Sequence, residues 1–215
     1  MTDKTCYASQ PIHIFLEKLA RDVPALPGAG SALGLLGALA ASLGAFVLKV
    51  SAKKVSKISF EQKQRCEELI RNFESFQLKC QKLMDADADA YRKVIEAFNI
   101  QGISAAGRSE KRKAIQDAFK EATKVPYELM KCSIDMLNYC SKSLGKSYKP
   151  VEADLAVAVE IARACFHGAF WIARANLGEI EDDEFVVGEL EKYEVLRKKI
   201  NKLYGELRKK LSEQI

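Results

Sequence analysis

The stretch PALPGAGSALGLLGALAASLGAFVLK, from Pro24 to Lys49, decides how the whole chain can fold. It begins as a turn rich in proline and glycine and continues as small and apolar residues, with no charge before Lys49. The run from Ala32 to Leu48 is close to the shortest apolar helix that spans a bilayer, for which about 17–25 residues are needed. The stretch is therefore either a membrane anchor or the buried helix of a bundle.

Its composition favours the buried helix. The run consists mainly of Ala, Gly and Leu, with few of the large β-branched or aromatic residues that favour lipid. Gly34, Ala38 and Ser42 recur every fourth residue, and small residues at this spacing let helix backbones approach closely, in a membrane or in water. Because the other predicted helices are amphipathic, they need a central partner to cover their apolar faces. We therefore expect a core helix and no membrane association.

The rest of the chain predicts an all-α protein. Apolar residues make up 48% of the 215 residues and charged residues 29%, which is typical of a globular domain, and the length suits a single domain over 1–215. Apolar residues recur at spacings of three and four, as in packed helices. The predicted helices cover about 11–20, 31–57, 60–98, 110–143, 151–177 and the C-terminal segment after about 183.

Helix start and stop signals refine this prediction. Ser59 and Gln62 form a capping-box pattern, Ser31 and Ser109 are expected to cap the second and fourth helices, and Pro126 should bend the fourth. Proline bends a helix because it lacks a backbone donor and its ring presses on the preceding turn. The fold class is therefore an all-α bundle of about six helices, several long, one kinked by proline, around a central helix rich in small residues.

Composition also argues against several functions. The six cysteines form no CxxC pair and the two histidines lie far apart, so no metal site is expected. Lysine and glutamate alternate and the net charge is only +5, which does not indicate nucleic-acid binding. The N-terminal sequence lacks the basic and apolar regions of a signal peptide, so we expect a cytoplasmic protein with reduced thiols.

Asp87 interrupts the apolar seam of the third helix, between Leu83 and Ala90. Burying an unpaired carboxylate costs several kcal/mol. Either Asp87 forms a buried salt bridge or helix cap, or the seam opens there into a cavity. Asp85 and Asp89 lie on other faces and are expected to be solvated.

Two further features stand out. Asp154 and Asn176 lie at opposite ends of one apolar stripe on the fifth helix, although an acid in a first turn is also favoured by the helix dipole alone. The Pro27–Ser31 turn precedes a helix, where free N–H groups attract electron-rich ligands, although a plain sharp turn has the same composition.

Four stretches, in order and at comparable spacing, resemble one family. The Pro24–Lys49 stretch resembles the P-x-PGGGS-x-A-A-L opening of the cyclodeaminase domain of formiminotransferase-cyclodeaminases and of stand-alone methenyltetrahydrofolate cyclohydrolases. LMDADADAYRKVIEAF resembles that family's D-x-x-A-Y-x-x-V segment, and RKAIQDAFKEATKVPYELM its I-Q-x-A…A-x-x-V-P segment. EADLAVAVEIARACFHGAFWIARANLGEIEDDEF resembles the S-D-x-x-V-A…N-V-x-x-N-L ending, and the resemblance runs from about Ile12 to Phe185.

The resemblance implies an all-helical homodimer that acts on tetrahydrofolate carrying a one-carbon unit and holds no bound cofactor. Members either close the formimino compound to the methenyl form with loss of ammonia, a lyase reaction, or hydrolyse the methenyl form. Carboxylates with pKa values raised toward neutrality suit both. We take Asp154 as the acid/base, with Asp87 second or binding the pterin amino groups. The matching folate-binding positions are Gly28, Gly30, Ser31, Tyr91 and Asn176, and on charge alone we add Lys146, Lys149 and Arg174 for the glutamate tail.

Four positions depart from the family pattern. They are Ala29, Lys146, Ala153 and Ile172, where the family has Gly, Asn, Ser and Asn. The resemblance leaves open which reaction dominates, which aspartate is the acid/base and how many glutamates the folate carries. The alternative is a non-catalytic helical interaction protein that keeps the fold; it predicts that Asp87 and Asp154 are each held in a buried ion pair.

Overall fold

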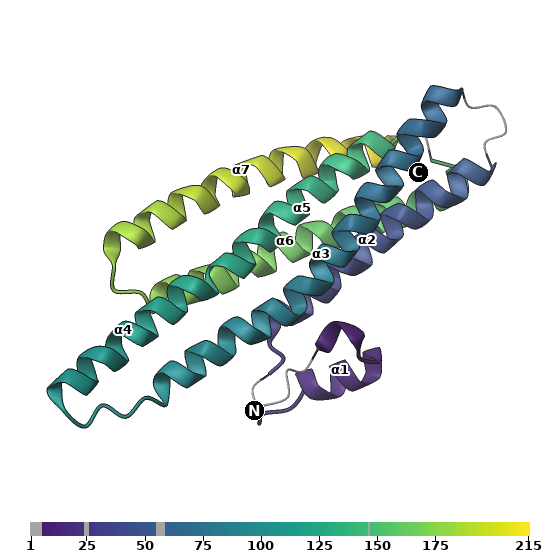
Figure 1. The fold of residues 1–215 in the computed structure, drawn as a ribbon. Coiled ribbons are helices and arrows are strands. Elements are labelled where there is room, and N and C mark those ends of the chain that lie inside the picture. Colours follow the sequence, from purple (N-terminus) through teal and green to yellow (C-terminus); the bar gives the residue numbers. More distant parts are fainter. Residues whose placement is uncertain (1–5, 24–25, 55–58, 146) are drawn as a thin grey trace.

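The computed structural model describes residues 6–23, 26–54, 59–145 and 147–215, and over these ranges the protein is all-α without a strand. Six helices form the bundle in Figure 1, and the short α1 lies against its side. The helices are α1 (Ile12–Leu19), α2 (Ala29–Lys54), α3 (Phe60–Phe98), α4 (Ala105–Ala122), α5 (Lys124–Ser143), α6 (Glu152–Gly178) and α7 (Asp183–Gln214). Short 3₁₀ turns, η1 (Tyr7–Ser9) and η2 (Lys149–Val151), precede α1 and α6. The all-α prediction is confirmed.

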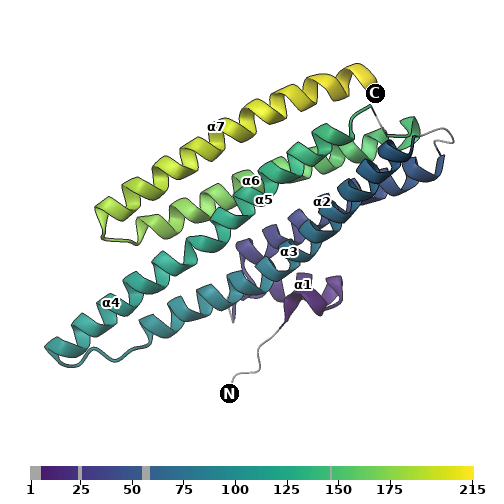
Figure 2. The same cartoon turned by 45° about the horizontal axis from the view of Figure 1, so that its top comes forward.

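The small residues of α2 allow its neighbours to lie very close. A Cβ atom added at Gly34 would lie 2.6 Å from the Met84 side chain of α3, and one added at Gly44 would lie 2.5 Å from the Phe73 ring. Figures 1 and 2 show α2 and α3 side by side along much of their length. The prediction that the small residues of this helix let a neighbouring helix approach closely is therefore confirmed.

Two helices of the described chain are long and apolar enough to cross a membrane. They are α2, with a mean hydropathy of 2.0 in its most apolar window, and the segment Lys149–Gly178, with 1.4. Of these two windows, 56% and 44% are buried inside the bundle. About half of each window is thus buried, and the remainder is partly or fully exposed.

The fourth predicted helix is two helices in the structure. The cap is Ser104, whose side chain accepts a hydrogen bond from the Gly107 N–H at 3.0 Å, so the expected cap at Ser109 is wrong. The helix is interrupted at Thr123, three residues before Pro126. Because Pro126 has no N–H, the Ala122 carbonyl lacks its usual intrahelical donor, and the Asn176 side chain of α6 donates to it at 3.0 Å.

Of the other local predictions, one is confirmed, one lies outside the described residues and one is wrong. The capping box at Ser59 and Gln62 is confirmed, with hydrogen bonds of 2.9 and 3.2 Å in the two directions. The expected end of the second helix near Lys57 lies outside the described residues. Helix α2 begins at Ala29, because the Ala32 N–H already donates to the Gly28 carbonyl at 3.1 Å, so Ser31 is not its cap.

Candidate functional site

The first turn of α2 meets Asp87 of α3. Ser31 is buried in this turn, and its free backbone N–H donates to Asp87 Oδ2 at 2.8 Å. Its hydroxyl oxygen lies 2.8 Å from the Met84 carbonyl oxygen and 3.2 Å from Asp87 Oδ2. Asp87 therefore occupies the N-terminus of α2, where helix N–H groups lack intrahelical partners.

Burial raises the pKa of Asp87 above its usual value, and the hydrogen bonds from the Ser31 side chain and backbone oppose this only in part. The hydrogen-bond geometry around Asp87 also agrees with a raised pKa. The Ser31 hydroxyl has one proton for two acceptors, and the carbonyl of Met84 is the nearer of the two. A proton on Asp87 supplies the second hydrogen bond. The site thus holds a carboxyl group that stores a proton more readily than an exposed aspartate does.

The other carboxyl oxygen, Oδ1, has no hydrogen-bond partner among the described residues. It lies beside Gly30, where an added Cβ atom would come within 1.9 Å of it. Glycine is therefore required at position 30 by the close approach of Asp87. At Gly28, in contrast, an added Cβ atom would meet nothing within 4 Å, so the space beside the turn is open.

A cavity of about 260 Å³ lies beside this carboxyl group. It is lined by the turn before α2 together with the first residues of α2, by the second half of α3, by the end of α4 and by the second half of α6. The lining residues are Leu26, Gly28, Ala29, Gly30, Asp87, Ala90, Tyr91, Ala122, Ile172 and Asn176. One hollow thus contains the glycine turn and the half-buried acid, as the sequence predicted for a binding site.

Two polar residues join Asp87 at the cavity wall. Tyr91 lies one helical turn after Asp87 and is 44% exposed. Asn176 also lines the cavity, but its side-chain N–H donates to the Ala122 carbonyl. The structure thus places both predicted folate-binding residues at the cavity and gives Asn176 a structural bond as well.

The structure does not bring Asp154 to this cavity within one chain. Asp154 lies in the first turn of α6 and Asn176 in its last turn, about 33 Å away at 1.5 Å per residue. Lys149, in η2, lies at the same distant end. Arg174 is exposed near the cavity end but is absent from its lining, and its guanidinium lies 5.9 Å from the Trp171 ring centre. Lys146 lies outside the described residues.

The aspartates that flank Asp87 have different roles. Asp85 accepts hydrogen bonds from the backbone N–H groups of Tyr7 and Ala8, at 2.6 and 3.4 Å, and thereby fixes η1 to α3. Asp89 forms an ion pair with Arg92 at 2.6 Å. Both carboxylates are half-buried, so the expectation that they are simply solvated is wrong. Each instead stabilises a local contact.

Neither Asp87 nor Asp154 forms an ion pair with any residue in the described part of the chain. The non-catalytic alternative predicted a buried ion pair for each. Asp87 has hydrogen bonds from Ser31 where that alternative requires a cation. The described residues also contain no cluster of three or more His, Cys, Asp and Glu side chains arranged to hold a metal ion.

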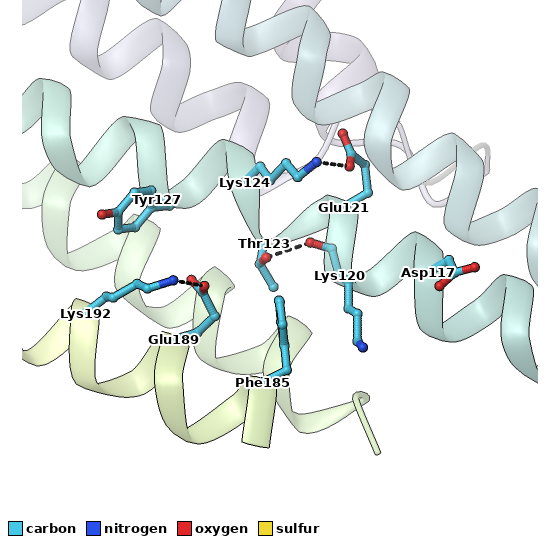
Figure 3. Close-up of a pocket in the computed structure, with 9 residues that line it drawn as sticks. All are labelled: Asp117, Lys120, Glu121, Thr123, Lys124, Tyr127, Phe185, Glu189 and Lys192. Atoms are coloured by element: carbon cyan, nitrogen blue, oxygen red, sulfur yellow. Dashed lines mark hydrogen bonds and ion pairs between the residues drawn. The ribbon is translucent and has the colours of Figure 1, made fainter. Parts of the chain in front are cut away.

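A second cavity, of about 320 Å³, lies between the α4–α5 junction and α7 (Figure 3). Its charged side chains are largely paired. Lys124 pairs with Glu121, Lys192 with Glu189 at 2.7 Å, and Lys120 with Asp182 at 2.6 Å. A cavity whose lysines already hold acids has little charge to offer a ligand, and we place the candidate site at Asp87.

Sequence reasoning did not assign several residues of the cavity wall to binding. Ala90 and Ala122 were expected only as seam residues, and Ala29 and Ile172 were noted only as departures from the family pattern. The available signal was their spacing: Ala90 lies near Asp87 on α3, and Ile172 lies one turn before Asn176 on α6. Two of the four departures, Ala29 and Ile172, are therefore in the wall of the site itself.

Comparisons with known proteins agree with this architecture. The chain is 25% identical over 190 residues to the methenyltetrahydrofolate cyclohydrolase of Methylorubrum extorquens, covering 87% of this chain and 89% of that protein. It is 23% identical over 176 residues to the formimidoyltransferase-cyclodeaminase of Sus scrofa, covering 82% of this chain. It spans only 32% of the length of the Sus scrofa protein.

A solved structure shares the fold. The formiminotetrahydrofolate cyclodeaminase of Thermotoga maritima superposes with a TM-score of 0.83 at 24% identity, over 95% of this chain and 97% of that one. The family model described as formiminotransferase-cyclodeaminase matches residues 11–194, which is most of the chain. The protein belongs to the formiminotransferase-cyclodeaminase family.

Proposed function

We propose that the protein is a tetrahydrofolate one-carbon enzyme that forms or opens the methenyl bridge of 5,10-methenyltetrahydrofolate. The observation that carries this proposal is Asp87, a carboxyl group with a raised pKa that lines a cavity and has one oxygen without a hydrogen-bond partner among the described residues. Family membership and the named activities of the relatives support the substrate class.

Both reactions of these relatives need a group that moves a proton. In cyclodeamination the N10 nitrogen attacks the formimino carbon, the bond from that carbon to the terminal nitrogen breaks, and the proton of N10 must reach the departing ammonia. In cyclohydrolysis water adds to the methenyl carbon and gives up both of its protons: one is released, and the other moves from the new hydroxyl group to N5 as the N5–carbon bond breaks and the formyl C=O forms on N10. A carboxyl group with a pKa near the working pH can both accept and donate.

Asp87 fits this task better than Asp154 does within one chain. Its Oδ2 is fixed by Ser31, and its Oδ1 is available to a ligand. We therefore revise the order predicted from the sequence: Asp87 is the acid/base, and Asp154 acts only where something brings it to the cavity.

The volume of the cavity limits how much of the substrate can be enclosed. Its volume of about 260 Å³ lies just below the ~300–1,000 Å³ common for ligand pockets. This space suits a bicyclic ring, with the remainder of the folate outside. Tyr91 can pack against a flat ring, and the exposed Arg174, two residues before the cavity residue Asn176, is the cation we assign to the carboxylates of a glutamate tail.

The methenyl chromophore provides a direct test. Its absorbance should appear when the protein is given 5-formiminotetrahydrofolate, or disappear faster than the spontaneous rate when it is given the methenyl compound. The first result identifies a cyclodeaminase and the second a cyclohydrolase. If neither rate exceeds the rate without protein, while the protein is folded by circular dichroism, the enzymatic proposal is wrong and the non-catalytic interaction protein replaces it.

We also propose that the enzyme works in the cytoplasm as a homodimer, without nucleic acid or membrane. Exposed large apolar side chains on α2 and α6, such as Phe46 and Trp171, support the homodimer, since exposed apolar surface of this kind marks an interaction site.

A further inference from the structure

Three cysteines from three helices line one small void in the core. Cys80 of α3, Cys132 of α5 and Cys165 of α6 are each no more than 2% exposed. The void that they line has a volume of about 10 Å³, which is room for about one water molecule. None of the three lines the cavity beside Asp87, so the proposed folate reaction does not use them. Because thiols can be oxidised, their surroundings decide whether they only fill the core.

Burial makes two of the core cysteines unreactive. It raises the pKa of Cys140 to about 12 and that of Cys165 to about 11. The Cys165 thiol also donates a hydrogen bond to the Leu33 carbonyl at 3.4 Å, so its proton already has an acceptor. Since the thiolate is the nucleophile, these two side chains are inert at neutral pH.

Cys132 has different surroundings. Lys79 of α3 forms an ion pair with Glu128 of α5 at 2.8 Å, and Glu128 precedes Cys132 by about one helical turn. The Cys132 sulfur accepts a hydrogen bond from the Cys80 thiol and has the Lys79 ammonium group beside it. The bond from Cys80 is the largest cause of a lowered pKa at Cys132, and Lys79 adds to it, whereas burial and Glu128 oppose the change. Of the four core thiols, Cys132 therefore ionises most readily.

Cys80 is the second thiol of this pair. As the donor of the hydrogen bond it keeps its proton, and this bond together with burial raises the pKa of Cys80. Its sulfur also lies against α2, since a Cβ atom added at Gly37 would come within 2.8 Å of it. A readily ionised thiol beside a protonated second thiol is the arrangement of a peroxide-sensitive cysteine and the cysteine that resolves it.

The size of the void limits which oxidant can react. Cys132 is 2% exposed and the void has room for about one water molecule, so a bulky disulfide such as oxidised glutathione cannot reach the sulfur. Hydrogen peroxide has only two heavy atoms and needs little more room than water. The Lys79 side chain is 46% exposed and also lies beside Cys132, so a single side chain separates this thiol from solvent.

We propose that Cys132 and Cys80 form a redox site for small hydroperoxides, in which Cys132 reacts first and Cys80 resolves the product. The Cys132 thiolate attacks one peroxide oxygen, the O–O bond breaks, and Cys132 becomes a sulfenic acid while the other oxygen leaves and takes up a proton. The Cys80 sulfur then loses its proton and attacks the Cys132 sulfur, so that the S–S bond forms and the sulfenic oxygen leaves as water. The two thiols lose two electrons and the peroxide gains them. This site is independent of the proposed folate reaction.

The first experiment identifies the product in the folded protein. Reduced Cys6→Ser protein, which lacks the exposed cysteine, is treated with a few equivalents of hydrogen peroxide, alkylated under denaturing conditions and digested. Digestion with trypsin and chymotrypsin separates Cys132 from Cys140. Mass spectrometry should find a disulfide between Cys80 and Cys132 that dithiothreitol removes. If both thiols stay reduced, or if Cys80 is joined to Cys165, the proposal is wrong.

Single variants, each shown to be folded by circular dichroism, test the separate roles of the two thiols. In Cys80→Ser the sulfenic acid of Cys132 should persist and be trapped by dimedone, because no second thiol removes it. In Cys132→Ser, Cys80 should stay reduced, because its pKa is raised. Cys165→Ser is the matched control from the same void and should still form the disulfide. Sulfenic acid at Cys80 in Cys132→Ser would overturn the assigned order.

Two rates test the roles of the lysine and of the void. Lys79→Met should slow oxidation about threefold to tenfold, because fewer Cys132 side chains are ionised while each thiolate is a somewhat better nucleophile. Lys131→Met is the matched control, since Lys131 also pairs with Glu128 at 2.8 Å but belongs to the surface of α5, and it should keep the rate. Equal slowing in both variants contradicts the role of Lys79. Oxidised glutathione should leave the pair reduced over the time in which peroxide oxidises it, and equal rates would overturn the assignment to small hydroperoxides.

Discussion

The first turns of α2 and α6 each have an aspartate beside them, but one aspartate belongs to a different helix and the other to the helix itself. Asp154 belongs to the first turn of its own helix, where the dipole stabilises an acid by ~0.3–1 kcal/mol. Asp87 reaches the first turn of α2 from α3, and burial there raises its pKa. An acid supplied by another helix can be held in a partly dry cavity, whereas an acid in its own first turn is placed by local geometry alone.

The largest expected effect tests the role of Asp87. Asp87→Asn should lower the rate of the folate reaction by about 10²–10⁴-fold, because an amide cannot exchange a proton with the substrate. The methenyl absorbance assay measures this change. Asp89→Asn, which removes an ion pair on another face of α3, is the matched control and should retain the rate within a few-fold. Equal rates for wild type and Asp87→Asn would remove Asp87 from the mechanism.

The same variant should change how stability depends on pH. The pKa of Asp87 in the folded state lies above the unfolded value of 3.8, so the wild type loses stability as the pH rises from that value through the folded pKa. Asp87→Asn does not have this loss of stability with rising pH, because the amide does not titrate. The difference in unfolding free energy, variant minus wild type, should therefore rise over this pH window and then level off, as measured by urea denaturation. A difference that falls with pH would show that Ser31 stabilises the ionised form more than burial disfavours it.

Gly30→Ala should break the contact between the two helices. The added Cβ atom would lie 1.9 Å from Asp87 Oδ1, so the carboxyl or the turn must move, at a cost of about 1–3 kcal/mol. Gly205→Ala, in α7 where a Cβ atom meets nothing within 4 Å, should instead add ~0.5–1 kcal/mol. Chemical denaturation of both variants measures the contrast, and a stabilised Gly30→Ala would contradict the close approach.

Ser31→Ala should have a smaller effect. It leaves the Met84 carbonyl without its hydroxyl donor and removes one of the two groups that hold Asp87, which should cost ~1–2 kcal/mol. Ser42→Ala is the matched control on the same helix, because the Ser42 hydroxyl donates only to the Ala38 carbonyl of its own preceding turn. If both variants lose the same stability, the contacts of Ser31 with α3 are unimportant.

The smallest effect on stability is expected for Asp154 of α6. Asp154→Asn should lower stability by ~0.3–1 kcal/mol at low salt, and less at high salt, because salt screens the interaction of this half-buried carboxylate with the helix dipole. Asp135→Asn, at an exposed position in the middle of α5, should change stability less than this. Denaturation at two salt concentrations distinguishes the variants. A loss of several kcal/mol would mean that Asp154 has a buried partner.

Much of the fold was predictable because it depends on neighbours in sequence. The capping box at Ser59, the apolar seam of α3 and the small residues of α2 all follow from the repeat of a single helix. The inward position of Asp87 follows from the same repeat, since it lies on the seam. The cap of α4 was misjudged because Ser104 and Ser109 are both followed by helix-forming residues, and only the observed hydrogen bond to Gly107 selects Ser104.

The sequence by itself determined an all-α protein, a helix of small residues that a neighbour can approach closely, and the acid that interrupts the α3 seam, because each depends on a pattern within one helix. Only the tertiary structure decided that Asp87 lies against Ser31, that Asn176 serves the carbonyl freed by Pro126, and that Asp154 lies about 33 Å from the cavity end of α6. Helical periodicity fixes the direction of a side chain around its own axis, whereas the offset between two packed helices depends on the close contacts made by all their residues together.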